Sequence, residues 1–434
     1  MRNKYKDMLE DGIRRWNPWW AEKENINVLC GIRRDILPEI LKIIKLPHIK
    51  DIIGVRRSGK TTILYQLIKS FLDEKIKPKD IVFLNFDDSE IDASSFEEIL
   101  TSIGKINPEI KYLFIDEVQQ KNGWERWIRT LYDTKKLKQI FVSGSSASLL
   151  SQDIGRVLTG RHITFSIFPF SFKEYLKFFE WKNFNIDFLK YNKNKLLHYQ
   201  EDYIKNGGFP ETIGKTDSER KIILTNIYND VLSRDISSRF GASYDIIKNL
   251  SYHLLSNMSN EFSYRSAANS TGLSVETIEK YLDFLKESFM ILTIDAFSYK
   301  TKVKFKQNKK IYCIDTGLRN AVSFKFSEDL GRTVENVVFI ELKRRNKEVY
   351  YWKDKTGKEV DFIIKEGLKI KELIQVCWDV NNKKTKEREV KSLLEAMNEF
   401  KLKQGIVITE DYENEKKING KTIIFIPLWK WLLK

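Results

Sequence analysis

Gly54-Val55-Arg56-Arg57-Ser58-Gly59-Lys60-Thr61 fits the pattern G-x-x-x-x-G-K-[ST] and lies between a strand-like apolar run and a helix-like run. In such a loop, glycines let backbone N–H groups turn toward phosphate oxygens. The lysine reaches the β and γ phosphates, and the next hydroxyl holds Mg²⁺ at the positive end of the helix. The sequence therefore predicts a nucleotide-binding loop of these eight residues and Thr62, in which Lys60 also acts in catalysis and Thr61 is a metal ligand.

A pair of carboxylates ends another apolar run, Tyr112-Leu113-Phe114-Ile115-Asp116-Glu117. We expect Asp116 to hold Mg²⁺ together with Thr61, and Glu117 to orient and deprotonate the water that attacks the γ phosphate. The alternative is a strand that runs into an ordinary polar loop. A strand candidate at residues 81–86 separates the two motifs, and with the acidic pair it favours hydrolysis over a small-molecule kinase.

Strand-like and helix-like runs alternate in this region, which predicts an α/β fold with a doubly wound parallel sheet. Ligands of such sheets bind at the carboxyl ends of the strands. Beyond the strand expected at residues 139–143, Ser143 or Ser145 can hydrogen bond the attacking water or a phosphate oxygen, and we assign Ser145 to the catalytic group. A simple strand-to-helix turn is the alternative.

Arg156 and Arg161 precede the strand expected at residues 163–168. An arginine at this place can project toward the phosphates of a neighbouring subunit and stabilise the transition state. Arg161 is therefore the candidate arginine finger, in a homo-oligomer. A surface salt bridge is the alternative.

The chain has 434 residues, which predicts two to four domains. Its 75 Lys and Arg against 60 Asp and Glu leave a net charge of +15. A polyanionic partner such as nucleic acid, or an archaeal or lysine-biased proteome, explains this excess equally well. The three cysteines and four histidines show no disulfide or zinc spacing.

The first 15 residues are charged and do not resemble a secretory signal, and no apolar run approaches the length of a membrane span. These features predict a cytoplasmic protein without a membrane partner. Trp16, Trp19 and Trp20 favour an arm that packs on the body of the protein, with an interfacial membrane anchor as the alternative.

A helix-turn-helix is expected after residue 263. Residues 264–270 form its first helix, Ser274 caps the second, and an apolar face carries Val275, Ile278, Leu282 and Leu285. Strands at residues 289–292 and 310–314 would complete a wing. Four lysines between or beside these strands suit DNA phosphates: Lys302, Lys304, Lys306 and Lys309. The outward face of the second helix is mainly acidic, which argues against base reading and leaves a protein-docking role open.

Several motifs together resemble the archaeal and bacterial ATPases of the extended AAA+ class. They are residues 54–62, Phe114-Ile115-Asp116-Glu117-Val118-Gln119, Gly144-Ser145-Ser146, Gly160-Arg161, Pro169-Phe170-Ser171-Phe172 and Gly207-Gly208-Phe209-Pro210-Glu211. The resemblance implies ATP hydrolysis and a winged helix followed by a nuclease-like domain. The expected layout is an N-terminal arm (1–30), an ATPase domain (31–180), a helical lid (181–240), a winged helix (241–318) and a nuclease-like domain (319–434).

The C-terminal region resembles the restriction-endonuclease-like fold, in which a helix carboxylate, a strand Asp and a following E-x-K bind Mg²⁺. Glu335 and Asp361 match the two carboxylates. Gln375 and Cys377 replace the E-x-K pair, so the lysine is missing and we expect no working nuclease. The carbonyl of Gln375 can still bind a metal, and Lys369 or Lys371 could substitute for the lysine.

The sequence thus predicts an ATP-hydrolysing protein that uses ATP and Mg²⁺. Its nucleotide state would control the winged-helix and nuclease-like domains, which contact DNA without sequence preference or a protein partner. Two alternatives remain: a nucleotide-regulated DNA-binding module with little turnover, and an ATP-gated, metal-dependent nuclease.

Overall fold

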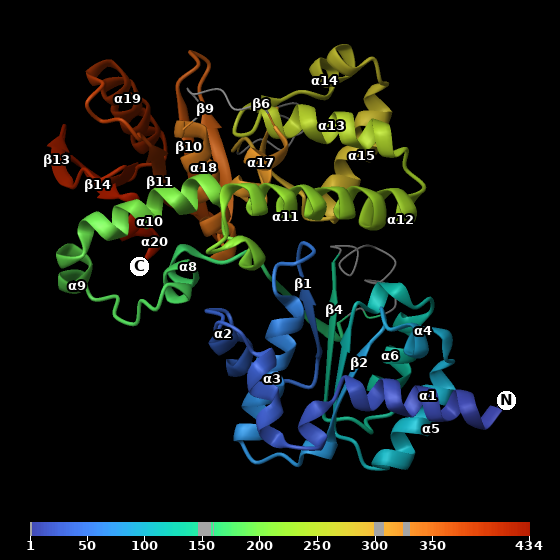
Figure 1. Cartoon of the computed structure of the whole chain (residues 1–434). Helices are drawn as coiled ribbons and strands as arrows, with labels where there is room; N and C mark the ends of the chain where they lie inside the picture. Colours follow the sequence, from blue (N-terminus) through green and yellow to red (C-terminus); the bar gives the residue numbers. More distant parts are fainter. Residues whose placement is uncertain (1, 146–157, 159, 299–307, 324–329) are drawn as a thin grey trace. The chain divides into compact units, whose positions relative to one another are not determined.

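A computed structural model describes residues 2–145, 158, 160–298, 308–323 and 330–434 (Figure 1). The chain forms two compact units, Met1–Ile167 and Phe168–Lys434. Arg156, Ser146, Lys302, Lys304 and Lys306, which carried sequence-based predictions, lie outside the described residues. No helix in the described part is long and apolar enough to span a membrane.

The first unit is built on a five-stranded parallel sheet in the order β2-β3-β4-β1-β5. Its strands are β1 (Ile49–Ile53), β2 (Ile81–Asn85), β3 (Tyr112–Asp116), β4 (Gln139–Gly144) and β5 (His162–Ser166). The helices of this unit are α1 (Arg2–Arg15), α2 (Leu37–Lys42), α3 (Lys60–Asp73), α4 (Ser89–Ala93), α5 (Phe96–Ile106) and α6 (Trp124–Asp133). The expected parallel α/β sheet is therefore present.

The segment before β1 is part of the core of this unit. Short 3₁₀ helices at Pro18–Trp20 and Lys23–Leu29 place Trp19 and Ile26 in one apolar cluster with α3 and the sheet. The side chain of Asn17 pairs with the edge strand β2, because its amide donates to the carbonyl of Phe83 and its oxygen accepts from the Phe83 N–H, both at 2.8 Å. The tryptophan arm thus packs on the body, as the sequence favoured.

The second unit begins with helices. These are α8 (Phe172–Phe178), α9 (Ile186–Tyr191), α10 (Lys193–Asn206), α11 (Asp217–Asp230), a π-helical turn (Val231–Ser237), α12 (Ser238–Phe240) and α13 (Tyr244–Ser256). In Figure 1, α11, the π-helical turn and α12 run on as one rod. Residues 181–240, where the sequence predicted a helical lid, are mostly helical.

A helix pair and a small sheet follow. The pair is α14 (Tyr264–Thr271) and α15 (Val275–Glu287), and Ser274 accepts a capping hydrogen bond from the N–H of Thr277. The antiparallel sheet has the order β6-β8-β7, from β6 (Glu261–Phe262), β7 (Ile291–Asp295) and β8 (Lys309–Cys313). Val275 was expected on the apolar face but is 43% exposed. It is the first residue of its helix, and Tyr281 is buried on that face instead.

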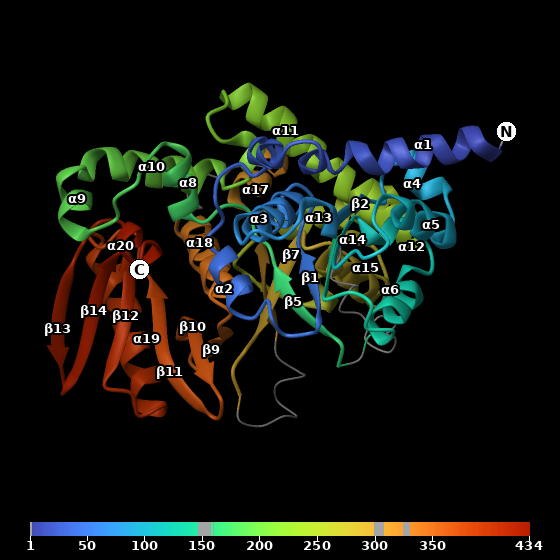
Figure 2. The same ribbon diagram turned by 90° about the horizontal axis from the view of Figure 1, so that it is seen from below.

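The last part of the chain is a six-stranded mixed sheet, seen from below in Figure 2. Its order is β13-β14-β12-β11-β10-β9. The strands are β9 (Glu348–Lys353), β10 (Glu359–Glu366), β11 (Lys369–Val376), β12 (Gln404–Thr409), β13 (Asn414–Ile418) and β14 (Lys421–Pro427). The accompanying helices are α17 (Thr316–Val322), α18 (Leu330–Arg344), α19 (Lys383–Glu399) and α20 (Leu428–Leu432).

The two glycines at 207 and 208 lie against another part of the second unit. A Cβ on Gly207, where φ is +74°, would lie 2.0 Å from Oδ1 of Asp315, and one on Gly208 would lie 2.3 Å from the carbonyl oxygen of Phe170. The Gly208 N–H donates to Asp315 at 2.7 Å, and Arg344 donates to the carbonyl of Pro169 at 3.0 Å. The Gly-Gly-Phe-Pro and Pro-Phe-Ser-Phe motifs therefore form one packed junction.

Candidate nucleotide-binding site

Three strands of the first unit end at the candidate site. β1 leads into residues 54–59 and then α3, and β3 ends at Asp116. β4 lies between β1 and β3, so its end, at Ser143 and Gly144, faces both motifs. The strand found between the two motifs in sequence, β2, is the sheet edge beyond β3.

The loop after β1 packs closely against neighbouring segments of the first unit. A Cβ on Gly54 would lie 2.2 Å from the carbonyl oxygen of Ile167, and Gly59 has φ of +95°. Arg34, only 3% exposed, donates to the carbonyl of Ser58 at 2.7 Å. Glycine is required at both positions, and Arg34 is a supporting residue that sequence reasoning missed because it lies outside the motif.

Lys60 turns back into the loop instead of reaching solvent. Its side-chain Nζ donates to the carbonyls of Gly54 and Val55, both at 3.2 Å, and the residue is only 4% exposed. The buried hydroxyl of Ser58 has no hydrogen-bond partner among the described residues. An ammonium and an unpaired hydroxyl inside a loop of turned-in backbone suit a phosphate group.

Thr61 and Asp116 meet across the end of the sheet. The Thr61 hydroxyl donates to Oδ2 of Asp116 at 2.5 Å, and Ser143 donates to Oδ1. Burial, and next the charge of Glu117, raises the pKa of Asp116 to about 6, although the bonds from Ser143 and Thr61 act to lower it. A buried carboxylate beside a hydroxyl provides the hard oxygen ligands that Mg²⁺ prefers.

Glu117 and Ser145 are linked through a residue that received no role from the sequence. Gln119 donates from one amide group both to Oε2 of Glu117 and, at 3.2 Å, to the Ser145 hydroxyl. Glu117 has φ of +51°, which is uncommon for a residue other than glycine. Such backbone outliers are concentrated at functional sites.

Within one chain, Arg161 does not join Glu117, Gln119 and Ser145. Its Nε donates to Oδ1 of Asp133, at the end of α6, at 3.0 Å. The surface salt bridge named as the alternative is therefore formed. Exposed pairs of this kind contribute little stability, so the arginine can exchange partners readily.

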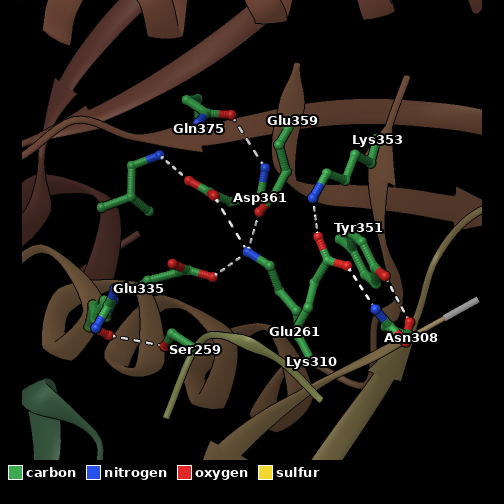
Figure 3. Close-up of polar contacts among 12 residues, drawn as sticks. Ser259, Glu261, Asn308, Lys310, Glu335, Tyr351, Lys353, Glu359, Asp361 and Gln375 are labelled. Carbon is green, nitrogen blue, oxygen red and sulfur yellow. Dashed lines mark hydrogen bonds and ion pairs between the residues drawn. The ribbon is translucent and has the colours of Figure 1, made fainter. Parts of the chain in front are cut away.

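The candidate nuclease residues also come together, within the second unit. Glu335 on α18 and Asp361 on β10 both contact Lys310 of β8, and Gln375 accepts from the Asp361 N–H (Figure 3). Lys369 and Lys371 are exposed on β11. Lys309 forms a 2.6 Å ion pair with Asp295.

Three family models match successive parts of the chain. Residues 47–176 match the family described as an AAA domain. Residues 197–329 and 330–431 match two domains of unknown function, DUF8612 and DUF4143. The chain therefore carries a P-loop domain of the AAA class.

The chain is also similar to whole proteins of two microbes. It is 37% identical to the uncharacterized protein MJ1544 of Methanocaldococcus jannaschii over 94% of this chain and 93% of that protein. An uncharacterized protein of Haemophilus influenzae is 30% identical over 92% and 98%. The chain belongs to the family of these proteins. Among solved structures, the chain matches the Aeropyrum pernix Orc1 protein in complex with DNA at 8% sequence identity. The match covers 68% of this chain and 93% of the Orc1 chain. Its TM-score of 0.31 is too low to indicate a common fold.

Proposed function

We propose that this protein binds ATP with Mg²⁺ and hydrolyses it to ADP and phosphate. The observation that carries the proposal is the 2.5 Å contact between Thr61 and Asp116, beside a loop that already encloses the Lys60 ammonium. A hydroxyl in the first turn of α3 and a carboxylate at the end of β3 are the pair expected to hold Mg²⁺ in a P-loop enzyme.

Each residue of the site has a distinct role in this proposal. The backbone of residues 54–62 cradles the phosphates, and Lys60 leaves its carbonyl partners to bind the β and γ oxygens. Thr61 and Asp116 hold Mg²⁺, which when bound neutralises phosphate charge. Glu117 accepts a proton from the attacking water, while Gln119 and Ser145 keep its carboxylate in position.

The position of Ile167 supports a route from the nucleotide to the second unit. Its N–H donates to the carbonyl of Ile53 at 2.6 Å, directly before the phosphate loop. Phe170, three residues later, donates to the carbonyl of Gly208 at 2.7 Å. A change in the loop would act on a connecting segment that is held at both ends, so we propose that the nucleotide state controls the second unit.

DNA or a protein partner would be contacted by this second unit. The helix pair α14–α15 and its three-stranded sheet are the kinds of element that make up a winged helix. The chain also carries a net charge of +15. The exposed face of α15 presents Glu276, Glu279 and Asp283, so any contact with DNA would be made through phosphates away from this face.

The test is phosphate release from ATP by the full chain, with and without duplex DNA. We expect Lys60→Ala and Glu117→Gln to lower turnover by at least about 100-fold, because each removes a group that acts on the transferred phosphate or the attacking water. Glu125→Gln, in the first turn of α6, is the matched control and should retain the wild-type rate.

Separate readings distinguish the alternatives. Nucleotide binding by Glu117→Gln without turnover is expected, while wild-type turnover in both variants would refute the site. If the wild-type protein binds DNA only with ATP but does not hydrolyse the ATP, the regulated DNA-binding module is favoured. Nicking of plasmid DNA in Mg²⁺ or Mn²⁺ would favour the gated nuclease.

A further inference from the structure

Lys310 lies at the centre of a cluster of carboxylates in the second unit (Figure 3). Its Nζ is 2.9 Å from Oε1 of Glu335 and 3.7 Å from Oδ1 of Asp361, and it forms a third ion pair with Glu359. The lysine comes from β8 of the small sheet, and the carboxylates come from α18 and β10. One ammonium thus joins three acidic side chains that are at least 25 residues away in sequence.

Most of the cluster is buried, although the side chain of Glu359 is 27% exposed. The side chain of Lys310 is 3% exposed, and the ring of Tyr351 lies 5.7 Å from its ammonium. Glu335 also accepts from the hydroxyl of Tyr312 at 2.7 Å. The second oxygen of Asp361 accepts from the backbone N–H of Val376 at 2.8 Å.

With the Lys310 ammonium among the carboxylates, the residues do not fit a divalent metal ion. The carbonyl of Gln375 accepts from the Asp361 N–H at 3.1 Å, and its amide donates to Glu389. The atom that could replace a metal-binding carboxylate is therefore already used. Among the described residues, no group of three or more His, Cys, Asp or Glu is arranged to hold a metal.

The charges of the cluster keep Lys310 protonated. The carboxylates of Glu335, Asp361 and Glu359 raise the pKa of Lys310, although burial acts to lower it. Burial raises the pKa of Glu335 and of Asp361, and the negative neighbours add to the effect at both residues. These shifts favour a charged Lys310 and oppose full ionisation of the carboxylates around it.

We propose that Lys310 is a built-in cation that takes the place of a divalent metal, and that its ion pairs lock β8 to the six-stranded sheet. The C-terminal sheet is then a rigid support for the small sheet and not a nuclease. Two neighbouring contacts also join the small sheet to the C-terminal part of the chain. Glu261 of β6 forms an ion pair with Lys353 of β9, and the Ser259 hydroxyl donates to the carbonyl of Arg332 at 3.0 Å. This inference is independent of ATP hydrolysis.

A titration with Mn²⁺, followed by electron paramagnetic resonance, tests the metal part of the proposal. The full chain with Asp116→Asn is used, since this change removes the cation ligand of the phosphate loop. We expect no tight Mn²⁺ site in this protein and one new site when Lys310→Met is added, because the carboxylates then lack their cation. One Mn²⁺ bound with Lys310 present, and lost on Asp361→Asn, would overturn the proposal.

Thermal unfolding tests the lock. Lys310→Met should lower the Tm of the full chain by about 10 °C, because it leaves buried carboxylates unpaired. Lys309→Met, on the same strand but in a half-exposed ion pair, is the matched control and should change the Tm by less than about 2 °C. Equal effects of the two substitutions would contradict a lock at Lys310.

A variant with an uncharged cluster is a second test, to be used if Lys310→Met does not fold. Lys310→Met combined with Glu335→Gln, Glu359→Gln and Asp361→Asn removes the unpaired charge, so at least half of the lost Tm should return. In this variant, hydrogen exchange should show faster opening of β8 and β10 together. Wild-type protection of both strands would show that the ion pairs do not join them.

Discussion

At the scale of single residues, β1 carries two buried ionisable side chains in a strand that is buried along its whole length. Asp51 is 1% exposed and contacts Nδ1 of His162, and the hydroxyl of Thr164 donates to it at 3.2 Å. Lys50 donates to Gln139 and to the carbonyl of Leu46, and burial lowers its pKa to about 8. Strands of parallel sheets are usually apolar, so these partners offset the cost of burying charge.

The pair of Asp51 and His162 predicts a pH dependence of stability. The hydrogen bond that Asp51 accepts raises the pKa of His162 and burial acts to lower it, while the charge of Asp51 adds to the rise. The folded chain therefore holds this proton more tightly than the unfolded chain. Its contribution is fully present below about pH 6.5, the value for an unfolded histidine, and is lost as pH rises through the raised pKa.

Urea unfolding of the full chain at a series of pH values measures this contribution. Between pH 6 and 8 the wild type should lose more stability than His162→Gln, whose amide does not titrate. The exposed His198→Gln serves as the control and should follow the wild type. Parallel curves for wild type and His162→Gln would rule out the pair as the titrating group.

At the scale of elements, the junction at residues 207–208 depends on close backbone approach. Gly208→Ala places a methyl group against the carbonyl of Phe170, a contact that backbone atoms cannot relieve without moving. We predict a loss of about 3 kcal/mol in the free energy of unfolding of the second unit.

Gly331→Ala is the matched control for this prediction. Gly331 lies in the first turn of α18, and nothing lies within 4 Å of the Cβ that the change would add. Alanine is the better helix former, so this variant should be unchanged or up to about 1 kcal/mol more stable. Denaturant unfolding measures both variants, and a similar stability of the two would show that the junction tolerates a side chain.

At the scale of the whole molecule, we propose that Arg161 acts on the phosphates of a neighbouring subunit. Its partner in a single chain, Asp133, is 44% exposed, so the ion pair can be exchanged at low cost. Arg161→Ala and Lys60→Ala should each be inactive alone. Mixed in equal amounts, they should recover roughly a quarter of the wild-type rate in a dimer, because half of the assemblies then hold one complete site.

Native mass determination accompanies this mixing experiment. If the protein is a monomer and the Arg161→Ala variant hydrolyses ATP at the wild-type rate, Arg161 serves only in the surface salt bridge. Arg129→Ala, which removes the other arginine paired with Asp133, separates loss of that surface network from loss of the finger.

The parts of the fold that depend on local signals could be predicted from the sequence. The phosphate loop requires glycines, a lysine and a hydroxyl at fixed spacing, and the apolar run before Asp116 indicates a buried strand end. The helix pair around Ser274 was predictable for the same reason, since caps and apolar faces are set by neighbours along the chain. The side chains that meet at a distance were not predictable in this way.

The tertiary structure brings together groups that are far apart in the sequence. It inserted β4 between the two motif strands, brought Gln119 to Ser145, set Asp315 against the glycine pair, and placed Lys310 among three carboxylates. Strand order and long-range ion pairs depend on how whole elements pack, and no pattern of neighbouring residues encodes that packing. A lysine on a strand looks like a surface residue in the sequence, and its burial as the counter-ion of a cluster follows from the fold alone.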